Sequence, residues 1–120
     1  MSSGYLLAGR KLPYGDLRRV LVRDQIKVEH WLRHEGGQYT ETRTWDDLIN
    51  LAMEIQSQPD ASAQQRHPEF KFSLSVAIWA AMRLDGDTVD LGDCLGQWTW
   101  DDLDFYDDAA EAEGKVDAGA

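Results

Sequence analysis

Apolar residues recur along this chain with the period of an amphipathic helix, a pattern that predicts an all-α fold. The most apolar stretch, about Phe72 to Leu84, leaves almost no polar face. Its alanine content and the glycine that follows at Gly86 favour a helix over a strand. We therefore expect a small bundle of about four to five helices around this central helix. The expected core residues are Trp45, Leu48, Phe72, Val76, Ile78, Trp79 and Met82.

A first helix is predicted upstream, where apolar residues at helical spacing develop from Asp16 and end at the Gly36-Gly37 pair. Its start has two interpretations. The helix begins near Asp16, or residues 17–22 form a strand and a shorter helix covers about residues 23–35, because β-branched valines flank a leucine in that stretch.

A second helix is predicted from Thr44 to about Gln56. Thr44 is followed three residues later by Asp47, which is a capping box in kind and stabilises a helix start by about 1 kcal/mol. Residues 57–68 contain two prolines and read as a polar loop before the central helix.

The two ends of the chain have weaker patterns. The first fifteen residues are rich in glycine and predict an irregular lead-in with a short strand possible over residues 5–7. Residues 88–95 suit one or two helical turns capped by Thr88, and residues 99–103 repeat the Thr44 pentapeptide letter for letter, which predicts another helix start. We expect residues 1–106 to form a single helical domain and residues 107–120 an acidic, flexible, disordered tail.

Charge is distributed unevenly along the chain. The formal net charge is -10, and residues 85–120 contain one Lys and twelve Asp or Glu, whereas residues 1–43 carry a net charge of +3. An acidic segment repels phosphate and attracts basic protein surfaces. We therefore expect a partner that is a protein, and neither nucleic acid nor membrane. No stretch approaches the roughly 18 to 20 apolar residues of a membrane span, and the N-terminus lacks a secretory signal pattern.

Catalytic and metal-binding motifs are not apparent. His30 and His34 have the i, i+4 spacing of metal ligands, but the glutamate of a metalloprotease helix is missing and Arg33 would oppose a cation. The acids from Asp85 onward do not follow the EF-hand spacing. Cys94 is the single cysteine and reads as a small buried hydrophobe. We expect no enzyme activity, no metal and no cofactor.

Five apolar residues lie among the acids of the last third and form the candidate partner-binding patch. Aromatic anchors beside charged residues are typical of protein interfaces. The alternative is that these side chains fold back onto the core around Trp79. The patch consists of Trp98, Trp100, Leu103, Phe105 and Tyr106.

The order of these features resembles the tail assembly chaperones of long-tailed, siphovirus-type bacteriophages, in particular those that infect actinobacteria. The resemblance covers about residues 16–108. It is strongest in the alanine-rich tryptophan helix at residues 76–86, the threonine-capped segment at 88–95 and the aromatic and acidic stretch at 98–105. Residues 23–29 and 44–48 resemble the family's opening helices.

This resemblance implies a protein that binds and solubilises the tape measure protein in the host cell cytoplasm, helps to recruit tail tube subunits and is absent from the mature virion. The tail tube protein is thus a second candidate partner. Such genes commonly make a longer product by programmed frameshifting, and Gly114-Lys115 can be encoded by a slippery GGG-AAA run. The frameshifted longer form and a second copy of the chain are further candidate partners.

Two other functions fit parts of the pattern. An acidic DNA mimic that inhibits a host nuclease or DNA-binding protein is motivated by the charge of the last third. A structural component of the virion is the other alternative.

Overall fold

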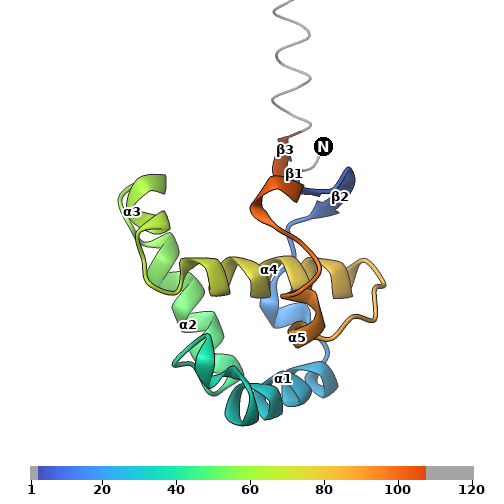
Figure 1. Cartoon of the computed structure of the whole chain (residues 1–120), viewed down its shortest axis with the longest axis vertical. Helices are drawn as coiled ribbons and strands as arrows, with labels where there is room; N and C mark the ends of the chain where they lie inside the picture. Colours follow the sequence, from blue (N-terminus) through green and yellow to red (C-terminus); the bar gives the residue numbers. More distant parts are fainter. Residues whose placement is uncertain (1–2, 108–120) are drawn as a thin grey trace, which may run out of the picture.

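A computed structural model describes residues 3–107 and shows a mixed α/β fold, so the prediction of an all-α bundle is wrong. Helices account for most of the described chain, and a three-stranded antiparallel sheet lies at one end of the central helix (Figure 1). The predicted tail, apart from Asp107, lies outside the described residues.

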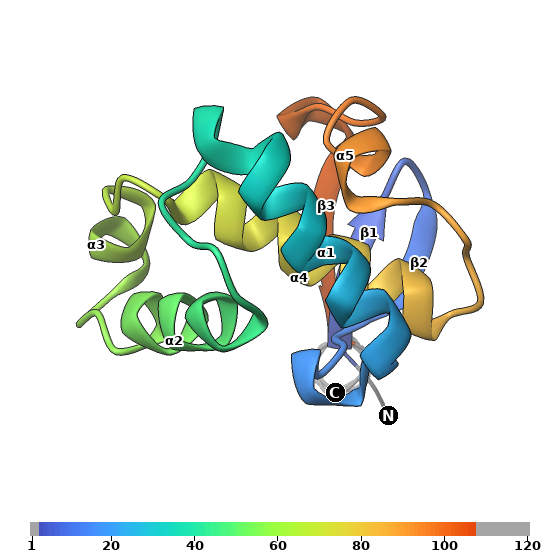
Figure 2. The same ribbon diagram turned by 90° about the horizontal axis from the view of Figure 1, so that it is seen from below.

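Within residues 3–107, five α-helices and three short 3₁₀ turns follow one another. The α-helices are α1 (Val22–His34), α2 (Trp45–Gln56), α3 (Ala61–Gln65), α4 (Phe70–Leu84) and α5 (Leu91–Cys94). The 3₁₀ turns are η1 (Leu17–Arg19), η2 (Gly36–Gln38) and η3 (Trp100–Asp102). α1 crosses α4 on one side, and α3 and the sheet project from the other side (Figures 1 and 2).

The start of α1 agrees with the shorter of the two predicted helices. Asp16 ends an extended segment and accepts a hydrogen bond from the Arg18 backbone at 2.9 Å, which stabilises η1 in place of a strand or an α-helical turn. The helix proper then begins at Val22.

The central helix α4 is present and ends where Gly86 predicts. Gly86 has a φ of 100°, a conformation that costs glycine little. Its N–H donates to the Arg83 carbonyl and the Asp87 N–H donates to the Met82 carbonyl. These two bonds satisfy carbonyl groups that the helix end would otherwise leave unpaired.

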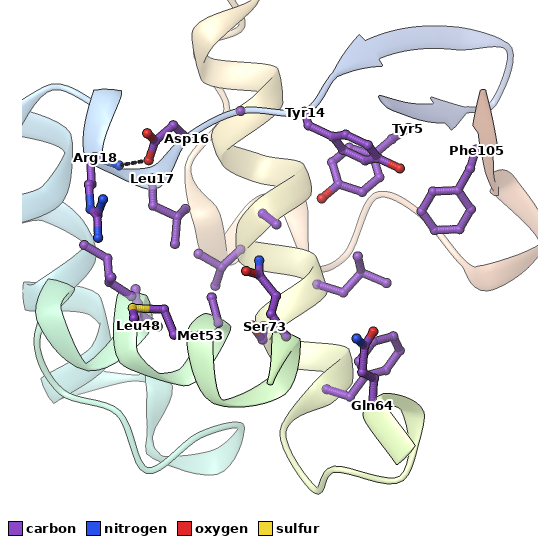
Figure 3. A pocket seen from close by; sticks show the side chains of 18 of the residues that line it. Tyr5, Tyr14, Asp16, Leu17, Arg18, Leu48, Met53, Gln64, Ser73 and Phe105 are labelled. Atoms are coloured by element: carbon purple, nitrogen blue, oxygen red, sulfur yellow. Dashed lines mark hydrogen bonds between the residues drawn. The ribbon is translucent and has the colours of Figure 1, made fainter. Parts of the chain in front are cut away.

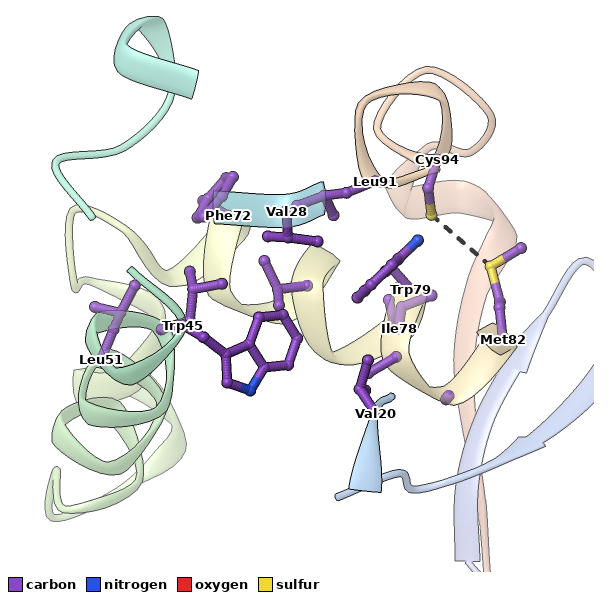
Figure 4. Close-up of a cluster of buried hydrophobic side chains, with 14 of the residues drawn as sticks. Val20, Val28, Trp45, Leu51, Phe72, Ile78, Trp79, Met82, Leu91 and Cys94 are labelled. Carbon is purple, nitrogen blue, oxygen red and sulfur yellow. Dashed lines mark hydrogen bonds between the residues drawn. The ribbon is translucent and has the colours of Figure 1, made fainter. Parts of the chain in front are cut away.

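α4 supplies more of the hydrophobic core than any other element (Figure 4). Trp79 packs edge-on against Trp45 of α2 with ring centroids 6.2 Å apart, and its indole Nε1 donates to the Val89 carbonyl at 2.8 Å. Leu12 and Tyr5 of the sheet complete the core from the other end. The structure buries all seven residues expected in the core: Trp45, Leu48, Phe72, Val76, Ile78, Trp79 and Met82.

The sheet has the strand order β2-β1-β3 and is formed by β1 (Ser3–Leu7), β2 (Arg10–Pro13) and β3 (Leu103–Asp107). β1 and β2 are joined by Ala8 and Gly9, both with positive φ, as in the tight turns that match the twist of a hairpin. β3 pairs with the other side of β1. The short strand predicted over residues 5–7 is present as part of β1, whereas the rest of the predicted irregular lead-in contributes β2 of a hairpin. The last third of the chain returns to pair with β1.

The prediction of a helix after Thr99 is wrong, although its start is recognisable. The Thr99 N–H donates to the Asp102 carboxylate at 2.9 Å, as the Thr44 N–H does to Asp47 at 3.1 Å. α2 then continues for twelve residues, whereas η3 stops after three. The reason is tertiary: the backbone after Asp102 finds its hydrogen-bond partners on β1 and not within a helix.

The short helix near residue 90 begins later than predicted. The Val89 N–H donates to the Asp87 side chain and the Val89 carbonyl accepts from Trp79, which holds this stretch extended. α5 consequently starts at Leu91 after Asp90, and Thr88 does not cap it.

Cys94 is fully buried against Met82, and burial raises the pKa of its thiol to about 11. The thiolate is the form that attacks thiol reagents, so the folded protein should react very slowly at pH 8. We expect Ellman's reagent to modify Cys94 promptly in 6 M guanidinium chloride but only at the rate of unfolding in buffer. Immediate reaction in buffer would contradict this packing.

A buried ion pair joins α1 to α4. Arg83 Nη2 lies 2.6 Å from Asp24 Oδ1, and this hydrogen bond holds the pKa of the Asp24 carboxyl below its usual value. The folded-state pKa is thus lower than that of the unfolded chain, so the contribution to stability is complete above about pH 4 and is lost as the pH falls further. We expect the stability difference between wild type and Asp24→Asn, measured by urea unfolding, to shrink between pH 6 and pH 3. An unchanged difference would contradict the assignment.

Candidate functional site

A groove of about 790 Å³ lies on α4, between α2 and the segment that leads from the sheet into η1 (Figure 3). α2 and α4 each turn a mainly apolar stripe towards the same space, and α3 contributes Ala61, Gln64 and Gln65. Each stripe has the i, i+3, i+4, i+7 spacing of a single helix face two turns long. The stripe of α2 is Ile49, Ala52, Met53 and Gln56, and that of α4 is Phe70, Ser73, Leu74 and Ala77.

Aromatic side chains from the sheet region form the far wall of the groove (Figure 3). Tyr5 packs edge-on against Tyr14 with centroids 4.9 Å apart, and Phe105 lies 5.9 Å from Tyr5 on the other side. Tyr14 and Phe105 are each more than half exposed. Burial raises the pKa of Tyr5 to about 12, so its phenol stays neutral at physiological pH.

The chemistry of the groove is that of a binding surface for an amphipathic segment. Asp16 and Arg18 are the charged residues among its described lining, and Asp16 already accepts from the Arg18 backbone. Glutamines at the rim offer neutral donors and acceptors. The small side chains of Ser73 and Ala77, one helical turn apart, allow another backbone to approach the floor closely.

Exposed apolar side chains mark the rim. Met53 is 55% exposed and lies one turn after Ile49, which packs against the core. Methionine adapts its shape to different partners and is common at binding surfaces of broad specificity. Met53, Tyr14 and Phe105 therefore outline the apolar opening of the groove.

The five residues of the predicted patch are divided among different surroundings. Trp98 and Leu103 pack against the core, and Tyr106 is buried with the Lys11 ammonium 4.9 Å from its ring centroid. Trp100 is 44% exposed and packs edge-on against Trp98. Phe105 is the member of the patch that lines the groove.

Sequence reasoning missed most of the groove. Leu74 and Ala77 belong to the central helix and were expected to be covered on all sides, and Met53 and Tyr14 were not considered. The available signal was the nearly uniform apolarity of residues 70–84. A helix that is apolar all round must be covered on every face, and a chain of 120 residues has few elements with which to cover it.

No metal site accompanies the groove: within residues 3–107, no three His, Cys, Asp or Glu side chains gather where they could hold a metal ion. His30 and His34 contact each other, with ring centroids 4.2 Å apart. In the same range, no helix combines the length and apolarity needed to cross a membrane.

Comparison of the chain with family models, with curated proteins and with solved structures gave no match. The function is therefore inferred from the chemistry of the groove, together with the charge and the pattern of the sequence.

Proposed function

We propose that this chain is a phage tail assembly chaperone that binds and solubilises the tape measure protein by taking up its amphipathic helical segments in the groove between α2 and α4. The observation that carries the proposal is the pair of matching apolar stripes. A helix laid between them packs against two helices at once, which is the arrangement of helix-in-groove recognition.

The size of the groove fits a transient complex. Its two stripes are each about two turns long, or roughly 10 Å at 1.5 Å per residue. A partner helix therefore buries only a few side chains. Such a small contact gives modest affinity, as a chaperone needs when tail tube subunits have to displace it from the tape measure.

The charge of the chain supports the same role. Residues 85–107 contain eight aspartates and no Lys or Arg. Chaperone molecules bound side by side along a long partner would add this acidity to the complex, which keeps the coated complex in solution. The role places the protein in the host cell cytoplasm during assembly and not in the finished virion. The frameshift site proposed at Gly114-Lys115 lies outside the described residues.

Co-expression tests the proposal. Tape measure fragments that are insoluble alone should become soluble and co-purify when expressed with this chain. The gene for the tape measure is expected immediately downstream of the gene for this chain. Fragments that remain insoluble in the presence of well-folded protein would overturn the proposal, and recovery of the chain from purified virions by mass spectrometry would favour a structural component instead.

Several acids that a DNA mimic would need are engaged within the protein. Asp85 and Asp87 both bind Arg10, at 2.8 and 3.1 Å, and Asp102 accepts from the Thr99 backbone. These contacts reduce the negative charge available to a DNA-binding protein, so the chaperone function is the better supported of the two.

A further inference from the structure

The outward face of α1 carries a cluster of exposed apolar side chains that the groove does not use. Leu21, Val22 and Ile26 are 60%, 67% and 59% exposed. Val22 and Ile26 are one helical turn apart and Leu21 precedes them, so the three lie close together on the surface. Because α1 crosses α4 on the side away from α3 and the sheet, a helix bound in the groove leaves these side chains uncovered (Figures 1 and 2).

The same face is positively charged, in contrast to the rest of the molecule. Arg19, Arg23, Lys27 and Arg33 are all exposed along this stretch. The acids of the helix are turned inward and engaged. Asp24 is buried and bound to Arg83, and Glu29 accepts from the Trp45 backbone at 2.8 Å. The surface that α1 exposes to solvent therefore carries cationic and apolar side chains, with few acidic side chains between them.

A second, mainly apolar cavity of about 490 Å³ opens beside this face, between α1 and the start of α5. Ile26 and Lys27 lie at the boundary between the exposed face and the cavity. The cavity walls include Trp31, Trp79 and Leu91. Its charged lining consists of Lys27, the paired Asp24 and Arg83, and the exposed Asp90 on the α5 side. A large apolar side chain fits such a space, and acidic neighbours of that side chain on the α1 side, away from Asp90, would meet the cations of α1.

We propose that the outer face of α1 is a second docking surface, and that its occupant is an acidic segment of another protein that inserts one aromatic or large aliphatic side chain into the adjoining cavity. The cations of α1 favour acidic residues in the partner segment, and the apolar cavity favours a large apolar side chain as its anchor. Nucleic acid also carries negative charge, but the net charge of -10 on the chain repels it. Contact with phosphates would also leave the three exposed apolar side chains without apolar partners. The inference is independent of the chaperone proposal, because it concerns a different face.

Peptide display provides the test. Random 16-residue peptides are selected on the wild-type chain after removal of those that also bind the Ile26→Ser variant. The recovered peptides should be rich in Asp and Glu and contain Trp, Phe or Leu. Synthetic versions, measured by fluorescence anisotropy, should bind at least about tenfold more weakly to Lys27→Glu/Arg33→Glu. They should bind unchanged to Arg66→Glu/Lys71→Glu, a matched double charge reversal at exposed sites away from α1.

Three results would overturn the proposal. The first is a selection that yields basic or uncharged peptides, or none that distinguish wild type from Ile26→Ser. The second is tighter binding of a 16-base-pair DNA duplex than of the acidic peptides, with loss of that binding in Lys27→Glu/Arg33→Glu. The third is concentration-dependent self-association in sedimentation that Ile26→Ser abolishes, because the face would then belong to a second copy of the chain. Circular dichroism establishes that each variant is folded.

Discussion

Replacing Arg83 with methionine should lower the free energy of unfolding by about 3–5 kcal/mol. It leaves the buried Asp24 carboxylate with a more distant ion-pair partner, the exposed Arg23, whose Nε lies 3.7 Å away. The Asp24 side chain is 6% exposed and the Arg83 side chain 14%, and their contact of 2.6 Å joins α1 to α4. Methionine fills much of the arginine volume, so the loss reflects the poorly paired charge more than a cavity. Because small proteins are stable by only about 5–15 kcal/mol, urea unfolding should show a large shift of the midpoint.

The double variant Asp24→Leu/Arg83→Met separates charge from packing. Apolar pairs of similar volume often replace buried ion pairs at little cost, so the double variant should be more stable than Arg83→Met alone. Two results would mean that the carboxylate is solvated and that the ion pair does not stabilise the packing of α1 on α4. One is that the losses in the free energy of unfolding add in the double variant, and the other is that Arg83→Met leaves this free energy nearly unchanged.

A glutamate at Ala77 should weaken binding of a tape measure segment by about tenfold to a hundredfold while the protein stays folded. Ala77 is half-buried on the floor of the groove and has room for a longer side chain in the free protein. In the complex, a partner helix would cover the new carboxylate and remove it from water. Binding is best measured by calorimetry with a soluble tape measure fragment.

Asn50→Glu is the matched control, since Asn50 is exposed on α2 and does not line the groove. It introduces the same charge and should leave the affinity within about twofold. Equal loss in both variants would point to a general effect of negative charge. No loss in Ala77→Glu would mean that the partner binds elsewhere.

The helices were predictable because their signals are local. Thr44 and Asp47 form the capping box that their spacing indicates, and Gly86 ends the central helix in the conformation that favours glycine. The residues of the core follow from the apolar period around Trp79. Information of this kind is contained in a few neighbouring residues and does not depend on the rest of the fold.

The sheet was not predictable in the same way, because its strands gain their stability from one another. The hairpin turn uses Ala8 at a positive φ, where Asn or Asp is usual, so the turn signal was weak. β3 follows a pentapeptide that starts a helix elsewhere in the chain. The pairing of Phe105 with Tyr5 joins residues at opposite ends of the sequence, and no local pattern reports such a contact.

The groove has the same limitation. Leu74 and Ala77 have the spacing of core residues, and only the arrangement of α2, α4 and the sheet shows that nothing in the described chain covers them. Conversely, Leu103 and Tyr106 lie in an acidic stretch whose composition predicts a surface segment. In the sheet, however, Leu103 packs against the core and Tyr106 is buried.

Methyl NMR of the chain, titrated with soluble segments of the tape measure protein, is the most direct test of binding in the groove. Signals from the methyl groups of Met53, Ala52, Leu74 and Ala77 should shift first and most, while those of Ile26 and Val22 on the opposite side of α4 should not. Shifts confined to methyl groups outside the groove would contradict the account. So would the absence of any shift on titration with segments that the chain keeps soluble in co-expression.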